Sequence, residues 1–446
     1  MSKSKKVVHF MGIGGSGLAG IAQIAKAYGF QVTGCDIAAE TSYLKKVTDA
    51  GIPVFLGHDP AHLKKTEILA VSPAIFYQND DHPETALGRK RKILMKWQEF
   101  MGTYLHRGKF VICIAGTHGK STTTALAGHL LETADLDPTV EIGATDPIWH
   151  NNVRIGKSPY FISEADEFHD NFASYHPDVI ILNNLEMDHP EYFTSEQKLL
   201  SAYQNFINHL KPLGRLIFNT DSPLLHKLHL PSDSIPYSLN AVQNIKLTPT
   251  RTSFNYQSHQ YQLKIPGLHN ISNALGIIEL ANILKVSASV SISTLKSFSG
   301  VGRRLELIGE KSGIKVYDDY ANHPTAFAAT IQACRQINPE GRLWVVIEPH
   351  TFSRLRSLLP QLPASLTKAD QIIVSKIFAS RETDPGDFSG ADIAAAAKHP
   401  HARYIPDFPD IAQAIKQEAS PGDTILVMGS GLSHKLSRQI LHDLKN

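Results

Sequence analysis

The segment FVICIAGTHGKSTTT, residues 110–124, joins an apolar run to a glycine-rich turn and then to the start of a helical stretch. An apolar run of this length is typical of a strand buried on both faces, as in a parallel sheet covered by helices. Similar runs occur at residues 7–10, 160–163, 179–182, 343–347, 371–374 and 424–428. The repeated pattern predicts an α/β fold, in which ligands bind at the carboxyl ends of the strands.

The turn inside this segment, residues 116–122, predicts a nucleotide phosphate site. Its backbone N–H groups can surround phosphates, Lys120 can reach the β- and γ-phosphates, and the Ser121 hydroxyl can ligate Mg²⁺. The turn departs from a strict Walker A motif because Ile114 occupies the position of the first glycine. The alternative is an incidental Gly-Lys-Ser sequence, which the strand–loop–helix context disfavours.

Another glycine loop, Gly12-Ile-Gly14-Gly-Ser-Gly17, follows the apolar run at residues 7–10. Glycines let the backbone turn tightly and approach a pyrophosphate at a helix N-terminus. Asp36 ends the next expected strand, where dinucleotide-binding folds place a ribose ligand. Taken alone, this loop indicates a dehydrogenase, and a tight turn without a ligand is the alternative.

Acidic residues follow two of the other apolar runs. Residues 164–167 read Glu-Ala-Asp-Glu, and residues 183–189 read Asn-Asn-Leu-Glu-Met-Asp-His. At the sheet edge that carries the phosphate loop, carboxylate oxygens would suit Mg²⁺, which neutralises charge on a transferred phosphoryl group. Solvated acidic loops are the alternative for each cluster.

The chain has 446 residues, more than one hydrophobic core usually organises. We expect three domains, at residues 1–106, 107–304 and 305–446. Within the second, residues 246–265 alternate polar and apolar side chains, as antiparallel strands do. The glycine-punctuated stretch at residues 297–304 is the expected hinge before the third domain.

Polar residues also follow expected strands in the third domain, at residues 318–324 and 348–356. Arg303 and Arg304, in the hinge, could clamp a phosphate when the domain closes, and surface charge is the alternative. Asn270 stands where a helix is expected to begin, so capping of that helix is an alternative to a ligand role.

Composition excludes several classes of protein. Hydrophobic residues make up 42% and charged residues 19%, and the formal net charge is +2, which gives no electrostatic case for nucleic acid or an anionic membrane. No apolar stretch approaches the roughly 20 residues that span a bilayer. We expect a solvated tail at Lys3, Lys5 and Lys6. The N-terminal stretch is not expected to be a signal peptide, because it lacks an apolar core. The three cysteines lack metal-ligand spacing, so buried free thiols in a reducing cytoplasm are expected.

Taken in order, these motifs resemble those of the Mur ligase family from end to end. The matching stretches are GIGGSG, VSPAI, GTHGKS, EADE, NNLEMDH, HNISNA, GVGRR, DDYANHP and EPHTFSR. The resemblance implies a Rossmann-like UDP-binding domain, a central P-loop ATPase domain and a Rossmann-like C-terminal domain that closes over the site. It also implies an ATP-dependent ligase of peptidoglycan synthesis, in which ATP converts a carboxylate to an acyl phosphate that an amine then attacks.

Within the family, HFMGIGGSGLAG and PHTFSR look most like the members that add L-alanine to UDP-N-acetylmuramic acid. The recycling ligases that add a murein tripeptide typically have PRSNT where this chain has PHTFS, and they remain the alternative. Three features depart from the pattern. Ser121 replaces a threonine, Asn322 replaces the first of two histidines, and residues 143–157 match loosely.

The resemblance also implies roles for individual residues. The catalytic residues would be Lys120, Glu164, His189 and Arg303. ATP would contact Gly116, Thr117, His118, Gly119, Lys120, Ser121, Thr122, Asn273, Arg304 and Asp319. Magnesium would be held by Ser121, Glu164 and His189. The UDP sugar would contact Gly14, Gly15, Ser16 and Ser72, and the amino acid would contact Tyr320, His323, His350 and Arg354.

Two readings from other classes leave part of the sequence unexplained. A nicotinamide-dependent dehydrogenase would use the first glycine loop and Asp36 but leave residues 116–122 without a purpose. A non-catalytic nucleotide switch would use residues 116–122 but leave the histidines and arginines of the third domain unexplained.

Overall fold

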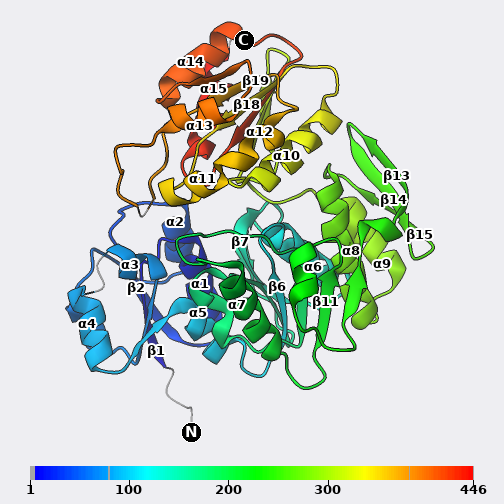
Figure 1. Cartoon of the computed structure of the whole chain (residues 1–446). Coiled ribbons are helices and arrows are strands. Elements are labelled where there is room, and N and C mark those ends of the chain that lie inside the picture. Colours follow the sequence, from blue (N-terminus) through cyan, green and yellow to red (C-terminus); the bar gives the residue numbers. More distant parts are fainter. Residues whose placement is uncertain (1–5, 79–80, 381, 445–446) are drawn as a thin grey trace. The chain divides into compact units, whose positions relative to one another are not determined.

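The computed structural model describes residues 6–78, 81–380 and 382–444, so Lys3 and Lys5 of the expected tail lie outside the described residues. The chain divides into two compact units. Unit 1 comprises Met1–Leu185, Gln197–Tyr237 and Gly276–Val290, and unit 2 comprises Glu186–Glu196, Ser238–Leu275 and Ser291–Asn446. Figure 1 gives the elements of both units.

The first sheet of unit 1 is parallel and has the strand order β3-β2-β1-β4-β5. Its strands are β1 (Val7–Met11), β2 (Gln31–Asp36), β3 (Val54–Leu56), β4 (Ile68–Val71) and β5 (Leu94–Lys96). The helices between and after them are α1 (Ser16–Ala27), α2 (Ser42–Asp49), α3 (Pro73–Gln78), α4 (Pro83–Lys90) and α5 (Trp97–Phe100). This order is Rossmann-like, and its ligand edge lies where the order reverses, at β1 and β4.

The second sheet of unit 1 has the order β12-β11-β10-β6-β9-β7-β8 and is parallel except for β8. Its strands are β6 (Phe110–Ala115), β7 (Thr139–Asp146), β8 (Asn151–Arg154), β9 (Tyr160–Ala165), β10 (Val179–Leu182), β11 (Arg215–Asn219) and β12 (Ile235–Tyr237). The accompanying helices are α6 (Lys120–Thr133) and α7 (Glu196–Asn208).

Helix α1 also packs against β7 and β8, which joins the two sheets of unit 1. The contact is close at Gly20, where an added Cβ would lie 2.6 Å from Val153 Cγ1. Beside it, the Asn152 side-chain amide donates a 2.7 Å hydrogen bond to the Ser16 carbonyl oxygen. The glycine loop before α1 is therefore anchored to the sheet that carries the second loop.

Unit 2 contains an antiparallel sheet and a larger mixed sheet. The antiparallel strands are β13 (Gln243–Thr248), β14 (Arg251–Tyr256) and β15 (His259–Leu263). The larger sheet has the order β16-β17-β21-β18-β19-β20, with strands β16 (Glu306–Lys311), β17 (Ile314–Asp319), β18 (Leu343–Ile347), β19 (Gln371–Val374), β20 (Ala402–Tyr404) and β21 (Thr424–Met428). The helices of unit 2 are α10 (Pro324–Ile337), α11 (Phe352–Leu358), α12 (Leu362–Leu366), α13 (Gly390–Ala396), α14 (Phe408–Glu418) and α15 (Ser433–Asp443). Helices α8 (Leu268–Ile283) and α9 (Ala288–Ser297) each belong partly to unit 1 and partly to unit 2.

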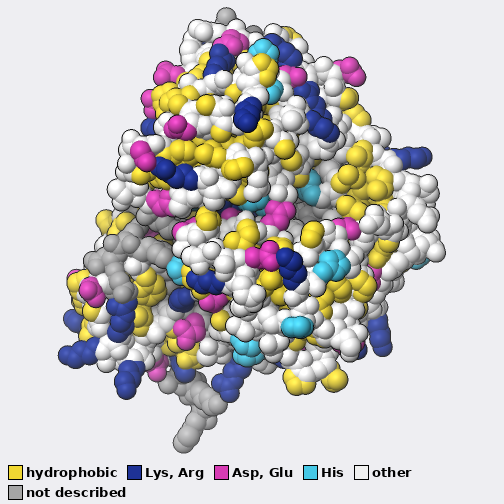
Figure 2. All heavy atoms as spheres, in the orientation of Figure 1, with side chains coloured by type: hydrophobic (Ala, Val, Ile, Leu, Met, Phe, Trp, Pro, Cys, Tyr) yellow, Lys and Arg dark blue, Asp and Glu magenta, His cyan; other side chains and the backbone are white. Residues whose placement is uncertain are grey.

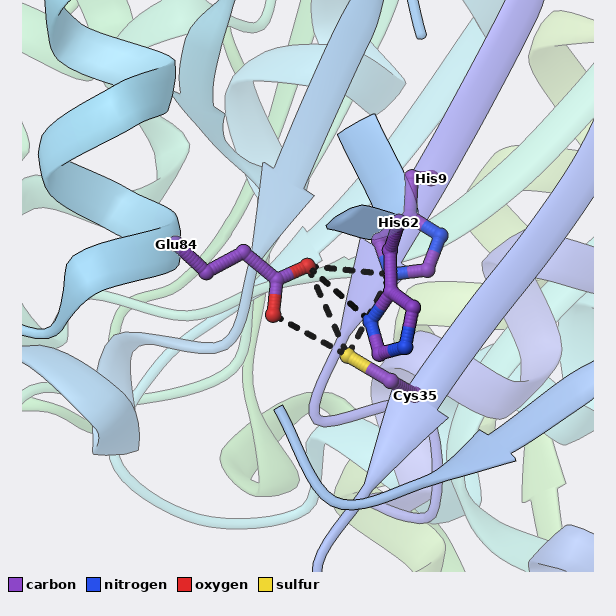
Figure 3. A group of neighbouring side chains, drawn as sticks. All are labelled: His9, Cys35, His62 and Glu84. Carbon is purple, nitrogen blue, oxygen red and sulfur yellow. Dashed lines mark hydrogen bonds and ion pairs between the residues drawn. The ribbon is translucent and has the colours of Figure 1, made fainter. Parts of the chain in front are cut away.

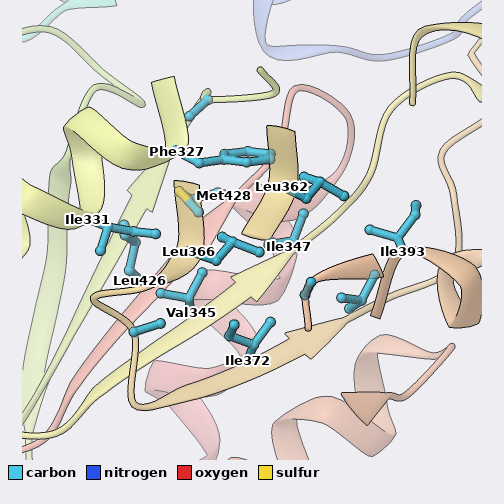
Figure 4. Packing of buried hydrophobic residues seen from close by; sticks show 14 of the residues in the cluster. Phe327, Ile331, Val345, Ile347, Leu362, Leu366, Ile372, Ile393, Leu426 and Met428 are labelled. Atoms are coloured by element: carbon cyan, nitrogen blue, oxygen red, sulfur yellow. The ribbon is translucent and has the colours of Figure 1, made fainter. Parts of the chain in front are cut away.

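The larger sheet of unit 2 is covered by helices on both faces. Alternate residues of its strands point to opposite faces. Val345 and Ile347 pack in a cluster with residues of α10, α12 and α13 (Figure 4), whereas Trp344 and Val346 pack in a cluster with residues of α14 and α15. Burial of both faces is the reason that these strands read as continuous apolar runs.

The predicted α/β fold with Rossmann-like outer sheets is confirmed. The strands predicted at residues 110–115, 179–182, 343–347, 371–374 and 424–428 have the predicted bounds. Antiparallel strands do occupy the region 246–265. The domain boundaries and the hinge at residues 297–304 stay predictions, although Gly300 has the left-handed φ of +91° that favours glycine.

Two local expectations need correction. Glu164 was expected just after its strand, but β9 extends to Ala165 and includes it. Asn270 was considered as a cap, but α8 already begins at Leu268, and the Asn270 side chain instead donates to the Pro266 carbonyl oxygen at 2.7 Å.

The surface and the cysteines agree with the composition. Positive and negative side chains are both scattered over the face seen in Figure 2, in keeping with the net charge of +2. Cys35, Cys113 and Cys334 are buried free thiols, as expected. None of the helices that the structure describes is both long enough and apolar enough to cross a membrane.

Candidate active site

The carboxyl ends of β10, β6 and β9 meet at one edge of the second sheet. In the parallel register, Ala115 at the end of β6 pairs with Leu182 of β10 on one side and with Ala165 of β9 on the other. The phosphate loop that follows β6, the residues that end β9 and the two asparagines that follow β10 therefore emerge side by side. The expectation of a shared edge is confirmed for the phosphate loop, the end of β9 and the two asparagines, whereas the arrival of residues 186–189 at this edge stays a prediction.

The loop after β6 has the backbone that its glycines permit. Gly116 and Gly119 have φ values of +133° and +83°, which disfavour residues with a Cβ. At Gly116 a Cβ would also lie 2.8 Å from the Asn184 carbonyl oxygen. Helix α6 begins at Lys120 directly after the loop. The first N–H groups of a helix have no partner within it, so they favour a bound anion here.

Lys120 is the cation of this loop. Its Nζ donates to the Gly116 carbonyl oxygen at 2.6 Å and to Glu167 Oε2 at 2.9 Å. Burial by itself lowers the pKa of Lys120, but the carboxylates of Glu167, Asp166 and Glu164 outweigh burial and raise this pKa above its ordinary value. The side chain is therefore a partly buried ammonium, held by Glu167 at the place where a phosphate would be a further partner.

Asn183 and Asn184 hold the loop in place, a role that was not predicted from the sequence. Asn184 Oδ1 accepts from the His118 backbone N–H at 2.8 Å, and Asn184 Nδ2 donates to the His118 carbonyl oxygen at 3.2 Å. Asn183 Nδ2 donates to Thr123 Oγ1 at 3.0 Å. Two adjacent side-chain amides directly after a buried strand were the available signal.

Replacing Asn184 with alanine is expected to weaken ATP binding without unfolding the chain. Two hydrogen bonds that shape the loop disappear, and each contributes about 1 kcal/mol, so the Kd should rise roughly tenfold to thirtyfold. Calorimetric titration with a non-hydrolysable ATP analogue measures this. Asn208→Ala, on the exposed side of α7, removes one surface contact with Gln204 and should leave the Kd unchanged. An unchanged Kd in Asn184→Ala would show that these bonds do not preorganise the loop.

Two carboxylates lie beside the loop, the partly buried Glu164 on β9 and the buried Glu141 on β7. Glu164 Oε1 accepts from the Gly143 backbone N–H at 2.5 Å. Burial, reinforced by the charge of Glu164, raises the pKa of Glu141 well above its usual range. Ser121, at the start of α6, is buried as well. The Ser121 hydroxyl and the Glu164 carboxylate are hard oxygen donors of the kind that Mg²⁺ prefers, so these two side chains fit the expected ion.

The first glycine loop is supported by Asp36. Asp36 Oδ2 accepts from the Gly14 backbone N–H at 2.8 Å, and Asp36 Oδ1 accepts from the Ala38 N–H at 2.9 Å. The carboxylate expected to hold a ribose in a dehydrogenase is thus used to shape the loop. Ser72, directly after β4, lies against the same loop, since a Cβ on Gly12 would come within 3.0 Å of Ser72 Cβ.

The remaining residues expected to bind the UDP sugar lie at the start of α1. Gly15 precedes the helix, and its N–H donates to the Gly12 carbonyl oxygen at 3.2 Å. Ser16 is the first helical residue. Gly14, Gly15, Ser16 and Ser72 are therefore neighbours, although residue 72 is far from the others in the sequence.

In unit 2, Arg303 makes several contacts near the start of the larger sheet. Its Nε donates to Asp318 Oδ2 at 3.0 Å, and its Nη2 donates to the Gly429 carbonyl oxygen at 2.6 Å and to Ser433 Oγ at 2.8 Å. The guanidinium also lies 4.9 Å from the centre of the Tyr320 ring. A phosphate bound by Arg303 would have to replace one of these partners or use Nη1.

Asp319, expected to position ATP, holds two backbone groups in unit 2. Its Oδ2 accepts from the Leu305 N–H at 2.7 Å and its Oδ1 from the Ala321 N–H at 2.8 Å. Burial raises the pKa of Asp319, and burial raises the pKa of Asp318 to about 6 despite the nearby Arg303. Two acidic groups with raised pKa values therefore end β17.

Unit 2 also brings the residues that follow β10 in sequence together with α10 and α11. Arg354 Nη2 donates to Asp188 Oδ2 at 2.6 Å, and both side chains are more than nine-tenths buried. Thr325 Oγ1 donates to Glu186 Oε2 at 2.7 Å, and His323 Nδ1 lies 3.6 Å from the same carboxylate oxygen. Neither pairing was predicted from the sequence.

Three further residues expected to bind ligands, His189, His350 and Asn273, lie in unit 2. His189 directly follows Asp188 and has a left-handed φ of +53°. The His350 ring stacks on Phe378 with a centroid distance of 5.7 Å. Asn273, buried on α8, donates to Asn270 Oδ1 at 3.2 Å.

Models of known protein families match three successive parts of the chain. Residues 7–107 match a model described as the catalytic domain of the Mur ligase family, residues 114–281 match the Mur ligase middle domain, and residues 303–431 match the glutamate ligase domain of Mur ligases. Their order is that of the three expected domains.

Two curated relatives, both named UDP-N-acetylmuramate–L-alanine ligase, match nearly the whole chain. The protein from Clostridium acetobutylicum is 34% identical over 98% of this chain and 97% of its own length, and the protein from Acetivibrio thermocellus is 33% identical over 98% and 96%.

Two solved structures share the fold. The UDP-N-acetylmuramate-alanine ligase MurC of Thermotoga maritima has a TM-score of 0.82 at 24% identity and covers 98% of each chain, and the murein peptide ligase of Psychrobacter arcticus has a TM-score of 0.71 at 23% identity and covers 99% of each chain. Since relatives at 33–34% identity cover it almost completely, the chain belongs to the Mur ligase family.

Proposed function

We infer that this protein is the ATP-dependent ligase that joins L-alanine to the carboxylate of UDP-N-acetylmuramic acid in peptidoglycan synthesis. The observation that carries the inference is the sheet edge that has Lys120 and Ser121 after β6 and Glu164 near the end of the neighbouring β9, an arrangement suited to phosphoryl transfer to a carboxylate. The relatives named for this reaction, at 33–34% identity over nearly the full chain, support the choice of substrates.

The reaction needs ATP because a carboxylate is a poor electrophile. A carboxylate oxygen of the UDP sugar attacks the γ-phosphorus, ADP leaves, and an acyl phosphate forms. The amine of L-alanine then attacks the acyl carbon, and collapse of the tetrahedral intermediate expels inorganic phosphate and a proton. Lys120 would stabilise charge on the transferred phosphoryl group, and the backbone N–H groups of residues 116–119 would orient the phosphates.

Magnesium would be held by Ser121 and Glu164, with His189 as a further ligand. When bound, the ion would neutralise negative charge on the phosphates. We propose that Asn273, Arg304 and Asp319 position ATP and that Arg303 reaches a phosphate. The first glycine loop and Ser72 would hold the UDP sugar, since the loop approaches a pyrophosphate without side chains in the way.

The donor site is proposed at Arg354, Tyr320, His323 and His350. A guanidinium suits the carboxylate of alanine because its N–H groups can bind both oxygens. In Arg354, Nη2 is engaged by Asp188, and Nε is buried with no hydrogen-bond partner among the described residues. An arginine with a buried donor left over is suited to a second carboxylate.

A parallel ligation assay tests this function. The protein is supplied with ATP and UDP-N-acetylmuramic acid together with L-alanine, glycine, L-serine or murein tripeptide, and the products are weighed by mass spectrometry. Phosphate release is followed in the same reactions and in reactions that lack either substrate. We expect product and phosphate release with L-alanine, and neither in the absence of the UDP sugar.

The other outcomes point to specific alternatives. If product forms only with the tripeptide, the proposed amino donor is wrong, but the ligase reaction still holds. If the rate of phosphate release is the same with and without the UDP sugar and the amino acid, a nucleotide switch is favoured. No phosphate release in any mixture would contradict the ligase reaction itself.

A further inference from the structure

A group of metal-ligating side chains lies in unit 1 on the first sheet, away from the phosphate loop in the sequence. It consists of His9 on β1, Cys35 on β2, His62 on the short 3-10 helix η1 (Pro60–Leu63) and Glu84 on α4. Figure 3 shows the four side chains converging on one point from these four elements. Their ligand atoms all lie within 4.8 Å of one another.

The separations between these atoms are those of a small coordination shell. His9 Nε2 lies 3.2 Å from Cys35 Sγ and 3.2 Å from Glu84 Oε1. Cys35 Sγ lies 3.6 Å from Glu84 Oε2, and His62 Nδ1 lies 3.7 Å from Glu84 Oε1. Zinc bonds sulfur at about 2.3 Å and imidazole nitrogen at about 2.0 Å, which places tetrahedral ligand atoms roughly 3.3–3.6 Å apart.

We propose that His9, Cys35, His62 and Glu84 form a binding site for a zinc-class divalent metal ion. The site would be structural, because four protein ligands complete a tetrahedral shell and leave no position for water or substrate. Binding would replace the proton of the Cys35 thiol by a metal–sulfur bond and release that proton to solvent.

Charge and burial favour a metal over a purely hydrogen-bonded cluster. His9, Cys35 and Glu84 are fully buried. Among the described residues, no lysine or arginine forms an ion pair with Glu84, and the groups that face its carboxylate are the rings of His9 and His62, which bind a metal ion in their neutral form. A buried carboxylate is costly without a compensating charge. One divalent cation would balance both the Glu84 carboxylate and the Cys35 thiolate.

The histidines are oriented for coordination. His9 Nδ1 lies 2.8 Å from Thr33 Oγ1, and with the ring proton on this bond the Nε2 lone pair faces Cys35 and Glu84. His62 Nδ1 is buried and has no hydrogen bond within the part of the chain that the structure describes. His58, whose Nδ1 lies 3.0 Å from Cys35 Sγ, offers a further nitrogen at the edge of the group.

The site would stabilise the loop proposed to hold the UDP sugar. The carbonyl oxygen of Cys35 accepts from the Gly12 N–H at 2.8 Å and from the Ile13 N–H at 3.2 Å. A metal on the Cys35 side chain would therefore fix the strand that supports this loop and would tie η1 and α4 to it.

Metal content tests the proposal directly. The full-length protein, without a polyhistidine tag and without nucleotide, is stripped with chelator, dialysed against Zn²⁺ and analysed by mass spectrometry of the metal. A parallel sample is loaded with Co²⁺, whose thiolate complexes absorb in the near ultraviolet. We expect one zinc per chain and a sulfur-to-cobalt band in the wild type, and neither in Cys35→Ser.

Two further variants make the result decisive. Cys334→Ser, a buried thiol on α10, should keep both the zinc and the cobalt band. His62 is partly exposed, so His62→Gln serves as the test if Cys35→Ser does not fold, and it should also lose zinc. Wild type that takes up no zinc, a cobalt complex without the sulfur band, or full zinc retention in Cys35→Ser or His62→Gln would overturn the site.

Discussion

Replacing Lys120 with alanine is expected to reduce ligation by a hundredfold or more. Lys120 is a partly buried ammonium at the start of α6, and its raised pKa keeps it charged at neutral pH. Losing such a contact to a transferred phosphoryl group costs about 3 kcal/mol of transition-state stabilisation, and about 1.4 kcal/mol corresponds to tenfold in rate. Initial rates of phosphate release with saturating UDP-N-acetylmuramic acid and L-alanine measure the loss.

The control for this prediction is Lys157→Ala, which removes an exposed lysine of the same unit and should leave the rate unchanged. Lys120→Ala also leaves Glu167 buried without its cation, so circular dichroism must show that the variant is folded. If folding fails, Lys120→Ala combined with Glu167→Gln removes the uncompensated charge. A folded variant with near-full activity would contradict the assignment of Lys120 to phosphate.

The fold was predictable where one physical cause dominates the sequence. Strands such as Phe110–Ala115 and Leu343–Ile347 are buried on both faces, so their bounds coincide with apolar runs. β9 was predicted too short because its end departs from this rule. Glu164 is a polar residue inside the strand, where it accepts a backbone N–H from Gly143. The polar side chain of Glu164 therefore made the strand look shorter in the sequence than it is.

The contacts that complete the sites depend on partners far apart in the chain. Asn184 and His118 are 66 residues apart, and Arg354 and Asp188 are 166 apart. Sequence patterns within a single segment do not predict such pairs. Cys35 was interpreted as a plain buried thiol for the same reason, since its neighbours come from β1, η1 and α4. Parallel strands bring together residues whose spacing in the sequence is set by the intervening helices.

Replacing Arg354 with alanine is expected to lower both stability and the apparent affinity for L-alanine. Asp188 would remain buried without its cation, and breaking a buried pair in this way typically costs about 3–5 kcal/mol of unfolding free energy. If Arg354 also binds the alanine carboxylate, the KM for L-alanine should rise by tenfold or more while the KM for ATP stays near the wild-type value. Urea unfolding and initial-rate kinetics provide the two measurements.

The double variant Arg354→Ala with Asp188→Asn separates the two roles of this arginine. Exchanging the carboxylate for an amide removes the uncompensated charge, so most of the lost stability should return. The Arg354 guanidinium proposed to bind the carboxylate of L-alanine would still be missing, so the KM for L-alanine should stay high. Arg356→Ala is the matched control, because its partner Asp387 is exposed and such pairs contribute only about 0–1 kcal/mol. Recovery of the wild-type KM together with stability in the double variant would mean that Arg354 serves the fold alone, and the donor carboxylate would need another partner.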